Sequence, residues 1–326
     1  MNYSISIMRV LATIYIVLYH CFCYYGLWII PDAVVNDKVF YFVPITGLVL
    51  NTFVFISGFL FAYLYKSKGK YRDYKSFIIN KTRRILIPYI FWGFIVILCL
   101  DQPLYSIFNG VSHLWFLLML FEIFIIARLF IGRLLSSSLL LQIGFVILLI
   151  LLNSARVRFF GNAFYHLQWT SVLQYIVPFV IGMICYSNNW IGKLNSTNKY
   201  MKYLLFTLAL TGTIIFSIIQ TLPFGSLYHD IPGFILIITT LALIESFSLA
   251  NVHVCIKSID KCSIGIYILH HIIIQSILRY VPGTHRLMNE HLIVAPILLF
   301  IVVFLISWLA TKFMFSNKYT MPIIGA

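Results

Sequence analysis

The chain has 326 residues, of which 61% are hydrophobic and only 10% are charged, and its formal net charge is +14. An ordinary soluble domain carries about 25% charged residues, so this composition excludes that class and indicates a polytopic membrane protein. The six cysteines show neither metal-ligand spacing nor matching loop positions, so we expect no structural disulfide and no bound metal.

Hydrophobic runs of about 17 to 25 residues are long enough to cross a bilayer as helices. The connections between such runs are short, so we expect an all-α polytopic bundle that forms one integral membrane domain over 1–326. Ten runs qualify, near 4–25, 40–65, 84–100, 113–131, 134–152, 170–187, 202–220, 228–250, 261–280 and 292–314.

The basic residues are distributed unevenly between the two sides of this bundle. Seventeen of the 23 Lys and Arg residues fall in alternate loops and the C-terminal tail, and five fall on the opposite side. The positive-inside rule then places both termini in the cytoplasm. The charge of +14 is therefore mostly a topology signal, and we expect membrane lipids rather than nucleic acid as partners. The first run lacks a convincing cleavage site, so we expect it to stay in the mature protein.

The first run carries Arg9 and His20 in an otherwise apolar stretch. At about 100° per residue, eleven positions return to within about 20° of the same helix face, about 16 Å further along the axis. Ionisable groups inside a membrane are functional candidates by default. The alternative is that Arg9 extends to the headgroups and His20 is a packing residue.

The second run and the loop after it offer candidate groups for an anionic ligand. Ser57 and Gly58 interrupt an aromatic run, where small residues allow close approach of a helix or a ligand. Lys81, Arg83 and Arg84 lie at the start of the third run, at the end of the most basic stretch of the chain. They can bind phosphate groups or attract anionic lipid, and both readings stay open.

The fourth run opens with His113 and Trp115 and carries Glu122 near its middle. An interfacial Trp is commonly a membrane anchor. A carboxyl group in mid-membrane needs a partner on another helix, a bound proton or a wet cavity. In the ninth run, Tyr267 and His270 share one helical face, which predicts either a site or an interhelical contact.

Five segments in this order resemble the membrane-bound acyltransferase-3 superfamily. They are the Arg9 and His20 pair, FVFISGFL in the second run, KTRRILIPY at the third, HLWFL at the fourth and SIGIYILH in the ninth. The resemblance extends over about residues 5 to 315. It implies a ten-helix membrane unit, here of the stand-alone type without a hydrolase-like domain, in a bacterial cytoplasmic membrane.

The family resemblance implies transfer of an acyl group, commonly acetyl, from cytoplasmic acyl-CoA to a sugar hydroxyl of a glycan or lipid-linked saccharide. The essential Arg and His of the family fall on Arg9 and His20. Its two cations, spaced three apart, fall on Lys81 and Arg84, and Lys81 departs from the family's Arg. Lysine binds phosphate as a point charge without the planar fork of arginine, so Arg83 is a candidate substitute.

These implications give each candidate residue an expected role. We expect His20 to act as general base, because its ordinary pKa of about 6.5 leaves much of it neutral at physiological pH. Direct attack by the acceptor is one mechanism, and an acyl-histidine intermediate is the other. The remaining candidates are Arg9 and Glu122 for catalysis, Lys81, Arg83, Arg84, Ser57 and Arg9 for acetyl-CoA, and His113, Trp115, Tyr267 and His270 for the acceptor.

Two alternatives to acetyl transfer stay open. A saccharide exporter or permease would also use buried charges, but its charges are expected around a midplane site. Here the cations gather at the predicted inner mouth and the histidines lie further out. A succinyl-type acyltransferase would keep the chemistry and change the donor. The oligomeric state is not determined by the sequence.

Overall fold

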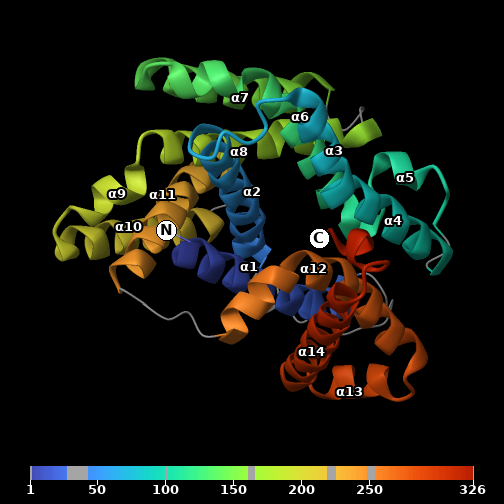
Figure 1. Ribbon diagram of the computed structural model, residues 1–326. Coiled ribbons are helices and arrows are strands. Elements are labelled where there is room, and N and C mark those ends of the chain that lie inside the picture. Colours follow the sequence, from blue (N-terminus) through green and yellow to red (C-terminus); the bar gives the residue numbers. More distant parts are fainter. Residues whose placement is uncertain are drawn as a thin grey trace. The chain divides into compact units, whose positions relative to one another are not determined.

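The computed structural model describes residues 2–27, 43–99, 102–160, 166–218, 225–247 and 254–325. Every regular element in these ranges is a helix (Figure 1). Within the same ranges, eight helical segments are long and apolar enough to cross a membrane, which confirms the predicted all-α polytopic bundle. The other two predicted runs, 202–220 and 228–250, coincide with α10 (Lys199–Ile218) and α11 (Gly225–Ser246).

The chain divides into two compact units. The first unit comprises Met1–Phe53 and Trp190–Lys312, and the second comprises Val54–Asn189 and Phe313–Ala326. The expectation of a single domain stays a prediction. The first unit contains α1 (Asn2–Leu27), the start of α2 (Val43–Lys66), α9 (Trp190–Asn195), α10, α11, α12 (Val254–Tyr280), α13 (Thr284–Glu290) and most of α14 (Val294–Ser316).

In the first unit, α1 packs along α12, and α10 packs along α11 (Figure 1). Arg9, in the N-terminal part of α1, contacts Asp260 in the N-terminal part of α12, and His20, further along α1, contacts His270 further along α12. The two helices therefore run in the same direction. That is the relation required of the first and ninth of ten alternating spans.

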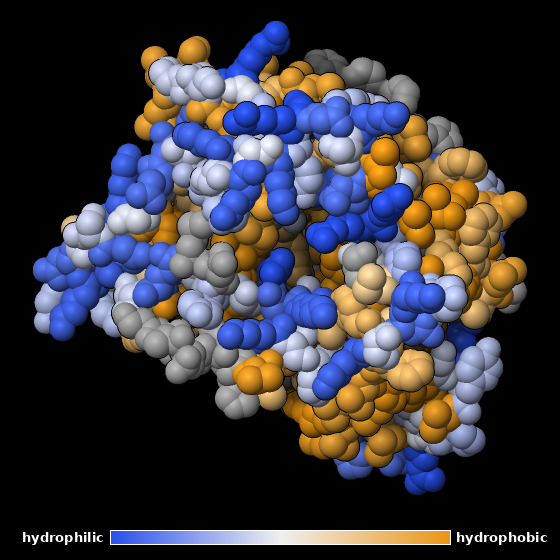
Figure 2. Space-filling view, in the orientation of Figure 1, coloured by the Kyte–Doolittle hydropathy of each residue, from blue (hydrophilic) through white to orange (hydrophobic). Residues whose placement is uncertain are grey.

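The outer surface of α14 is apolar, as expected for a helix that faces lipid. Ile297, Leu298, Ile301 and Val302 are all exposed. At about 100° per residue these four positions lie on one face of the helix. Figure 2 shows hydrophobic surface over the part of α14 that lies next to α13. Exposed aliphatic side chains at this density suit hydrocarbon rather than water as the surrounding solvent.

The second unit contains the rest of α2 and a series of helices that frame the predicted phosphate-binding residues. They are α3 (Tyr74–Lys81), the π-helical turn η2 (Thr82–Leu86), α4 (Ile87–Cys99), α5 (Ser106–Asn109), η3 (Ser112–Leu114), α6 (Trp115–Ser136), α7 (Leu139–Phe160), η4 (His166–Gln168), α8 (Trp169–Ser187) and η5 (Met321–Ile324).

The third spanning segment begins earlier than the sequence predicted. The helical segment starts at Tyr74 rather than near residue 84. Asp73 caps its first turn by accepting a hydrogen bond from the Ser76 amide at 2.8 Å. Hydrogen bonds from the Ser76 backbone and side chain lower the pKa of the Asp73 carboxyl, so the cap is intact at neutral pH and is lost only as the pH falls through that lowered value. Lys75, Lys81, Arg83 and Arg84 lower the mean hydropathy of this part of the helix, so the hydropathy pattern did not reveal its start.

Two glycines allow α2 and α8 to cross at backbone distance within the second unit. A Cβ atom on Gly58 would overlap the backbone carbonyl oxygen of Phe179, and one on Gly182 would overlap that of Phe55. Small residues at helix crossings are the common means of close packing in membranes. Of the two readings of Gly58, helix packing is therefore the one that the contacts support.

We expect Gly58→Ala to lower the thermal stability of the purified protein strongly. Overpacking costs about 1–3 kcal/mol, and more where the obstacle is backbone, as it is at Phe179. Gly144→Ala on α7 is the matched control, because a Cβ there meets nothing within 4 Å. That change should be neutral or stabilising by up to about 1 kcal/mol. Equal melting temperatures for the two variants would contradict the crossing described here.

Candidate active site

Three histidines from α1 and α12 form a cluster in the first unit. The rings of His20 and His270 stack with centroids 5.0 Å apart, and His271 meets His20 edge-on at 6.0 Å. His270 and His271 are buried, whereas His20 is half-buried. Part of the His20 side chain is therefore accessible to a substrate, while the side chains of His270 and His271 pack against it from the interior. The sequence predicted His20 and His270 as candidates from different helices, and the fold brings them together.

The hydrogen bonds of His270 assign the ring proton of His20. His270 Nδ1 lies 3.1 Å from the Ile266 carbonyl oxygen, which only accepts, so Nδ1 carries the proton. In a neutral imidazole the other nitrogen, Nε2, is then an acceptor. His20 Nδ1 lies 2.7 Å from that Nε2 and donates its N–H to it. The basic lone pair of His20 is therefore on Nε2.

His271 and Tyr267 make further contacts at this cluster. The amide nitrogen of Gln275 donates to His271 Nδ1 at 3.3 Å, so the proton of a neutral His271 ring is on Nε2. The ring of Tyr267 lies 5.8 Å from that of His270 and is half-buried. The expected acceptor-binding role of Tyr267 and His270 stays a prediction, but both lie at the His20 cluster.

Arg9 forms an ion pair with Asp260, also between α1 and α12. Its Nε and Nη2 atoms donate to the two carboxylate oxygens at 2.7 and 2.8 Å, and the Ser6 hydroxyl donates to the same carboxylate at 2.8 Å. The Arg9 and Asp260 side chains are 32% and 13% exposed. A bidentate pair fixes the guanidinium plane. Arg9 is therefore held in place on the same face of α1 as His20, as the spacing predicted.

Sequence reasoning missed Asp260, although a signal was present. The chain has only nine acidic residues, and Asp260 lies ten positions before His270. That interval nearly matches the eleven positions between Arg9 and His20. Two parallel helices with matching intervals can pair at both points.

Glu245, a second carboxylate of the first unit, has polar partners. It accepts hydrogen bonds from the hydroxyl of Ser4 at 3.1 Å and from the side-chain amide of Asn195 at 2.9 Å. Glu245 joins α11 to α1 and α9, which is a structural role.

In the second unit, Lys81 is buried in an aromatic cage. Its Nζ lies 3.3 Å from the ring centroid of Phe124, 5.3 Å from that of Tyr71 and 6.0 Å from that of Phe61. A cation over aromatic faces is stabilised by the ring quadrupoles, most when it is desolvated. Burial raises the pKa of the Tyr71 hydroxyl and the nearby Arg84 opposes that rise.

Arg83 and Arg84 are exposed on the π-helical turn that follows Lys81. A π turn inserts an extra residue into a helix and is frequent at functional sites. Here it separates a buried cation from two accessible ones. Ser57 is half-buried on α2. The assignment of these four residues to acetyl-CoA stays a prediction, and Arg83 and Arg84 are the ones that a phosphate can reach without rearrangement.

Arg128 on α6 holds the loop between α2 and α3, residues 67–73, in place. This role was not predicted from the sequence. Its Nε and Nη2 donate to the carbonyl oxygens of Tyr71 and Arg72 at 2.8 and 2.6 Å. Its guanidinium also lies 5.5 Å from the ring of Tyr65. These contacts fix the loop against α6.

We expect Arg128→Met to loosen this loop without unfolding the protein. Loss of two charge-assisted hydrogen bonds in a partly exposed site should cost about 2 kcal/mol locally. Tryptic cleavage between Lys66 and Lys75 should then accelerate about tenfold or more, because proteolysis follows the population of the open loop. Arg133→Met, an exposed position on the same helix, should leave the cleavage rate unchanged. Equal rates in both variants would contradict the anchoring role.

His113, Trp115 and Glu122 lie on or next to α6. His113 is buried, and the ring of the half-buried Trp115 lies 5.9 Å from that of Tyr175. Their expected roles in binding the acceptor stay predictions. Glu122 belongs to the second unit and His20 to the first, so the expected contact between them also stays a prediction.

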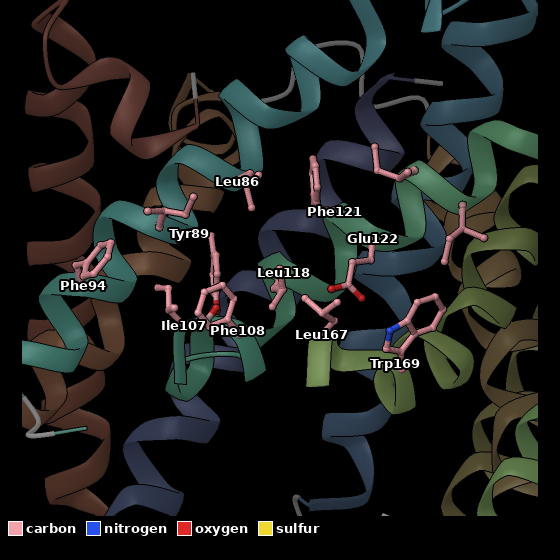
Figure 3. Close-up of a pocket in the computed structure, with 13 residues that line it drawn as sticks. Leu86, Tyr89, Phe94, Ile107, Phe108, Leu118, Phe121, Glu122, Leu167 and Trp169 are labelled. Carbon is pink, nitrogen blue, oxygen red and sulfur yellow. The ribbon is translucent and has the colours of Figure 1, made fainter. Parts of the chain in front are cut away.

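Glu122 lines an apolar pocket of about 600 Å³ within the second unit (Figure 3). Its Oε1 atom is buried and has no hydrogen-bond partner among the described residues. The lack of a partner for this oxygen is the type of feature that a bound ligand can explain. Across the described ranges, no three His, Cys, Asp or Glu side chains are arranged to hold a metal ion.

Comparison with known proteins assigns the chain to a family. The acyltransferase-3 family model, described as an acyltransferase domain, matches residues 2–312. No curated protein and no solved structure matches the chain. The match includes all five sequence segments, and the described helices have the length and apolar character of membrane spans. The chain therefore belongs to the acyltransferase-3 superfamily and is a multi-pass membrane acyltransferase.

Proposed function

We propose that the chain is an O-acetyltransferase of a bacterial cytoplasmic membrane. It moves an acetyl group from cytoplasmic acetyl-CoA to a hydroxyl of a cell-envelope glycan or lipid-linked saccharide. The observation that supports this most directly is the hydrogen bond from His20 Nδ1 to His270 Nε2. This hydrogen bond leaves the basic lone pair of His20 on Nε2, and the His20 ring is half-buried. The family to which the chain belongs transfers acyl groups, which requires such a base.

In the proposed reaction, His20 Nε2 takes the proton of the acceptor hydroxyl. The acceptor oxygen attacks the thioester carbonyl carbon, and a new C–O bond forms. The C–S bond then breaks, and the sulfur of CoA leaves with the electron pair and receives the proton from His20. The products are an acetyl ester and free CoA. His270 is a positioning residue, because it sets the tautomer and the orientation of the His20 ring.

Arg9 is proposed to line the entrance of the donor below His20. Asp260 engages the Nε and Nη2 donors of Arg9, which leaves the Nη1 donors for a substrate. Arg83 and Arg84 are proposed as ligands of the CoA phosphates, because arginine binds phosphate with a planar fork. Lys81 is proposed to support them from its aromatic cage by adding positive charge behind the turn.

The test is transfer of radiolabelled acetyl from acetyl-CoA into the glycan and lipid fractions of membranes that contain the protein. Membranes with wild-type chain should incorporate label, and membranes with His20→Ala at equal abundance should not. His291→Ala is the matched control, because His291 is an exposed histidine of the same unit. Equal label with His20→Ala would remove His20 as the base. No label with wild-type chain, in membranes shown to contain the acceptor, would favour an exporter or another donor.

A further inference from the structure

The pocket beside Glu122 is not used by the proposed reaction. Its walls come from η2, α4, α5, α6, η4 and α8, all within the second unit. Its volume of about 600 Å³ is in the range of ligand sites, which is about 300–1,000 Å³. The lining is aliphatic and aromatic apart from the Glu122 carboxyl, the Tyr89 hydroxyl and the Trp169 indole nitrogen.

The polar groups of the pocket differ in how they are satisfied. The Tyr89 hydroxyl already donates to the carbonyl oxygen of Ile107 at 2.6 Å. Glu122 Oε1, in contrast, is buried and accepts no hydrogen bond from the described residues. In Figure 3 the Glu122 carboxyl group points into the space near Leu118, Leu167 and Trp169. A buried acceptor of this kind is costly unless a donor reaches it.

The pocket is accessible from an apolar surface. Ile90 and Phe94 on α4 are 40% and 43% exposed, and both line the pocket. The helices that carry its walls include membrane-length segments. A molecule already dissolved in the bilayer can therefore enter without first crossing a polar barrier.

These observations select one class of occupant. The lining requires a hydrocarbon body, and the Glu122 oxygen requires an O–H or N–H donor. The acyl chain and thioester carbonyl of an acyl-CoA offer no donor, and its amide N–H groups lie on the polar pantetheine arm, which does not match the apolar lining. An anionic headgroup would place like charge next to a carboxyl group.

We infer that this pocket is a binding site for a membrane lipid that carries a hydroxyl group, with the hydrocarbon chain in the pocket and the hydroxyl donating to Glu122. This inference does not depend on the proposed acetyl transfer. It concerns binding alone and can be tested in the absence of acyl-CoA.

The experiment uses the full-length protein in detergent with two photoactivatable probes. One is a sixteen-carbon alcohol with a diazirine on its chain, and the other is its methyl ether, which lacks the donor. Labelled peptides are located by mass spectrometry. The alcohol should label α4 and α6 about tenfold more efficiently than the ether at equal low concentration, since a hydrogen bond to a buried carboxyl is of that order. Excess unlabelled alcohol should compete.

Three variants make the outcome specific. Glu122→Leu should reduce alcohol labelling to the level of the ether and leave ether labelling unchanged. Ile90→Trp, which fills the pocket from its exposed wall, should reduce labelling by both probes. Ile87→Trp is the matched control, because Ile87 has 37% exposure on the same helix and does not line the pocket.

Two results would overturn the inference. Equal labelling of wild-type protein by alcohol and ether would show that the hydroxyl group does not contribute, and that the probes bind only as hydrocarbon in an apolar recess. Alcohol labelling that survives Ile90→Trp would place the bound probe elsewhere. Neither result bears on acetyl transfer, which is measured separately with His20→Ala.

Discussion

Replacing His270 with leucine is expected to lower kcat for acetyl transfer about 10²-fold, the lower end of what a positioned general base contributes. The substitution removes the Nε2 acceptor that lies 2.7 Å from His20 Nδ1. His20 can then rotate or place its proton on Nε2, where it no longer acts as a base. Because His20 and the donor site remain, the KM for acetyl-CoA should change less than about twofold.

The conservative variant His270→Gln separates positioning from packing. The side-chain oxygen of glutamine can accept the His20 Nδ1 proton from a similar place, so kcat should recover to within about tenfold of wild type. A leucine variant with full kcat would contradict the positioning role. Equal losses in the glutamine and leucine variants, with a raised KM in both, would assign His270 to packing of the buried cluster instead.

Replacing Asp260 with leucine is expected to lower the free energy of unfolding by about 2–3 kcal/mol, because a partly buried guanidinium then loses its counter-charge. The bidentate bonds at 2.7 and 2.8 Å are lost together. Thermal unfolding in detergent measures this change. Ser6→Ala is the control, since it removes one hydrogen bond to the same carboxylate and should cost only about 1 kcal/mol.

The double variant Arg9→Met with Asp260→Leu distinguishes a structural Arg9 from a functional one. Replacing both partners of an ion pair by apolar side chains is often neutral, so stability should return to within about 1 kcal/mol of wild type. We expect acetyl transfer to remain at least 10²-fold below wild type, because the cation at the donor entrance is still absent. A stable double variant with normal transfer would show that Arg9 serves only to join α1 to α12.

Features that depend on a single helix could be predicted from the local periodicity of the sequence. The stripe of Arg9 and His20 follows from about 100° per residue, and both side chains do face α12. Hydropathy located the helices for a similar reason, since each must satisfy its own backbone in the membrane. It failed at the start of the third span, where the cap at Asp73 is followed by basic residues that belong to the helix.

Features that join two helices were not available from the sequence. Lys81 was predicted as a phosphate ligand from its charge, but the structure surrounds it with the rings of Phe124, Tyr71 and Phe61. Phe124 lies on another helix, and no local pattern connects it with Lys81. The sequence likewise showed that Glu122 needs an explanation, and only the tertiary structure brings residues of α4, α5 and α8 around it to form a pocket.

By itself, the sequence determined the fold class, the helices and the superfamily, because these depend on composition, on local period and on short segments in order. Only the tertiary structure decided that His270 orients His20 and that Asp260 holds Arg9, over separations of 250 and 251 residues. The physical reason is that hydrogen bonds at 2.7 Å require atoms on two helices to meet in one register. Hydrophobic periodicity selects the buried face of each helix, and the packing of all the helices selects the register.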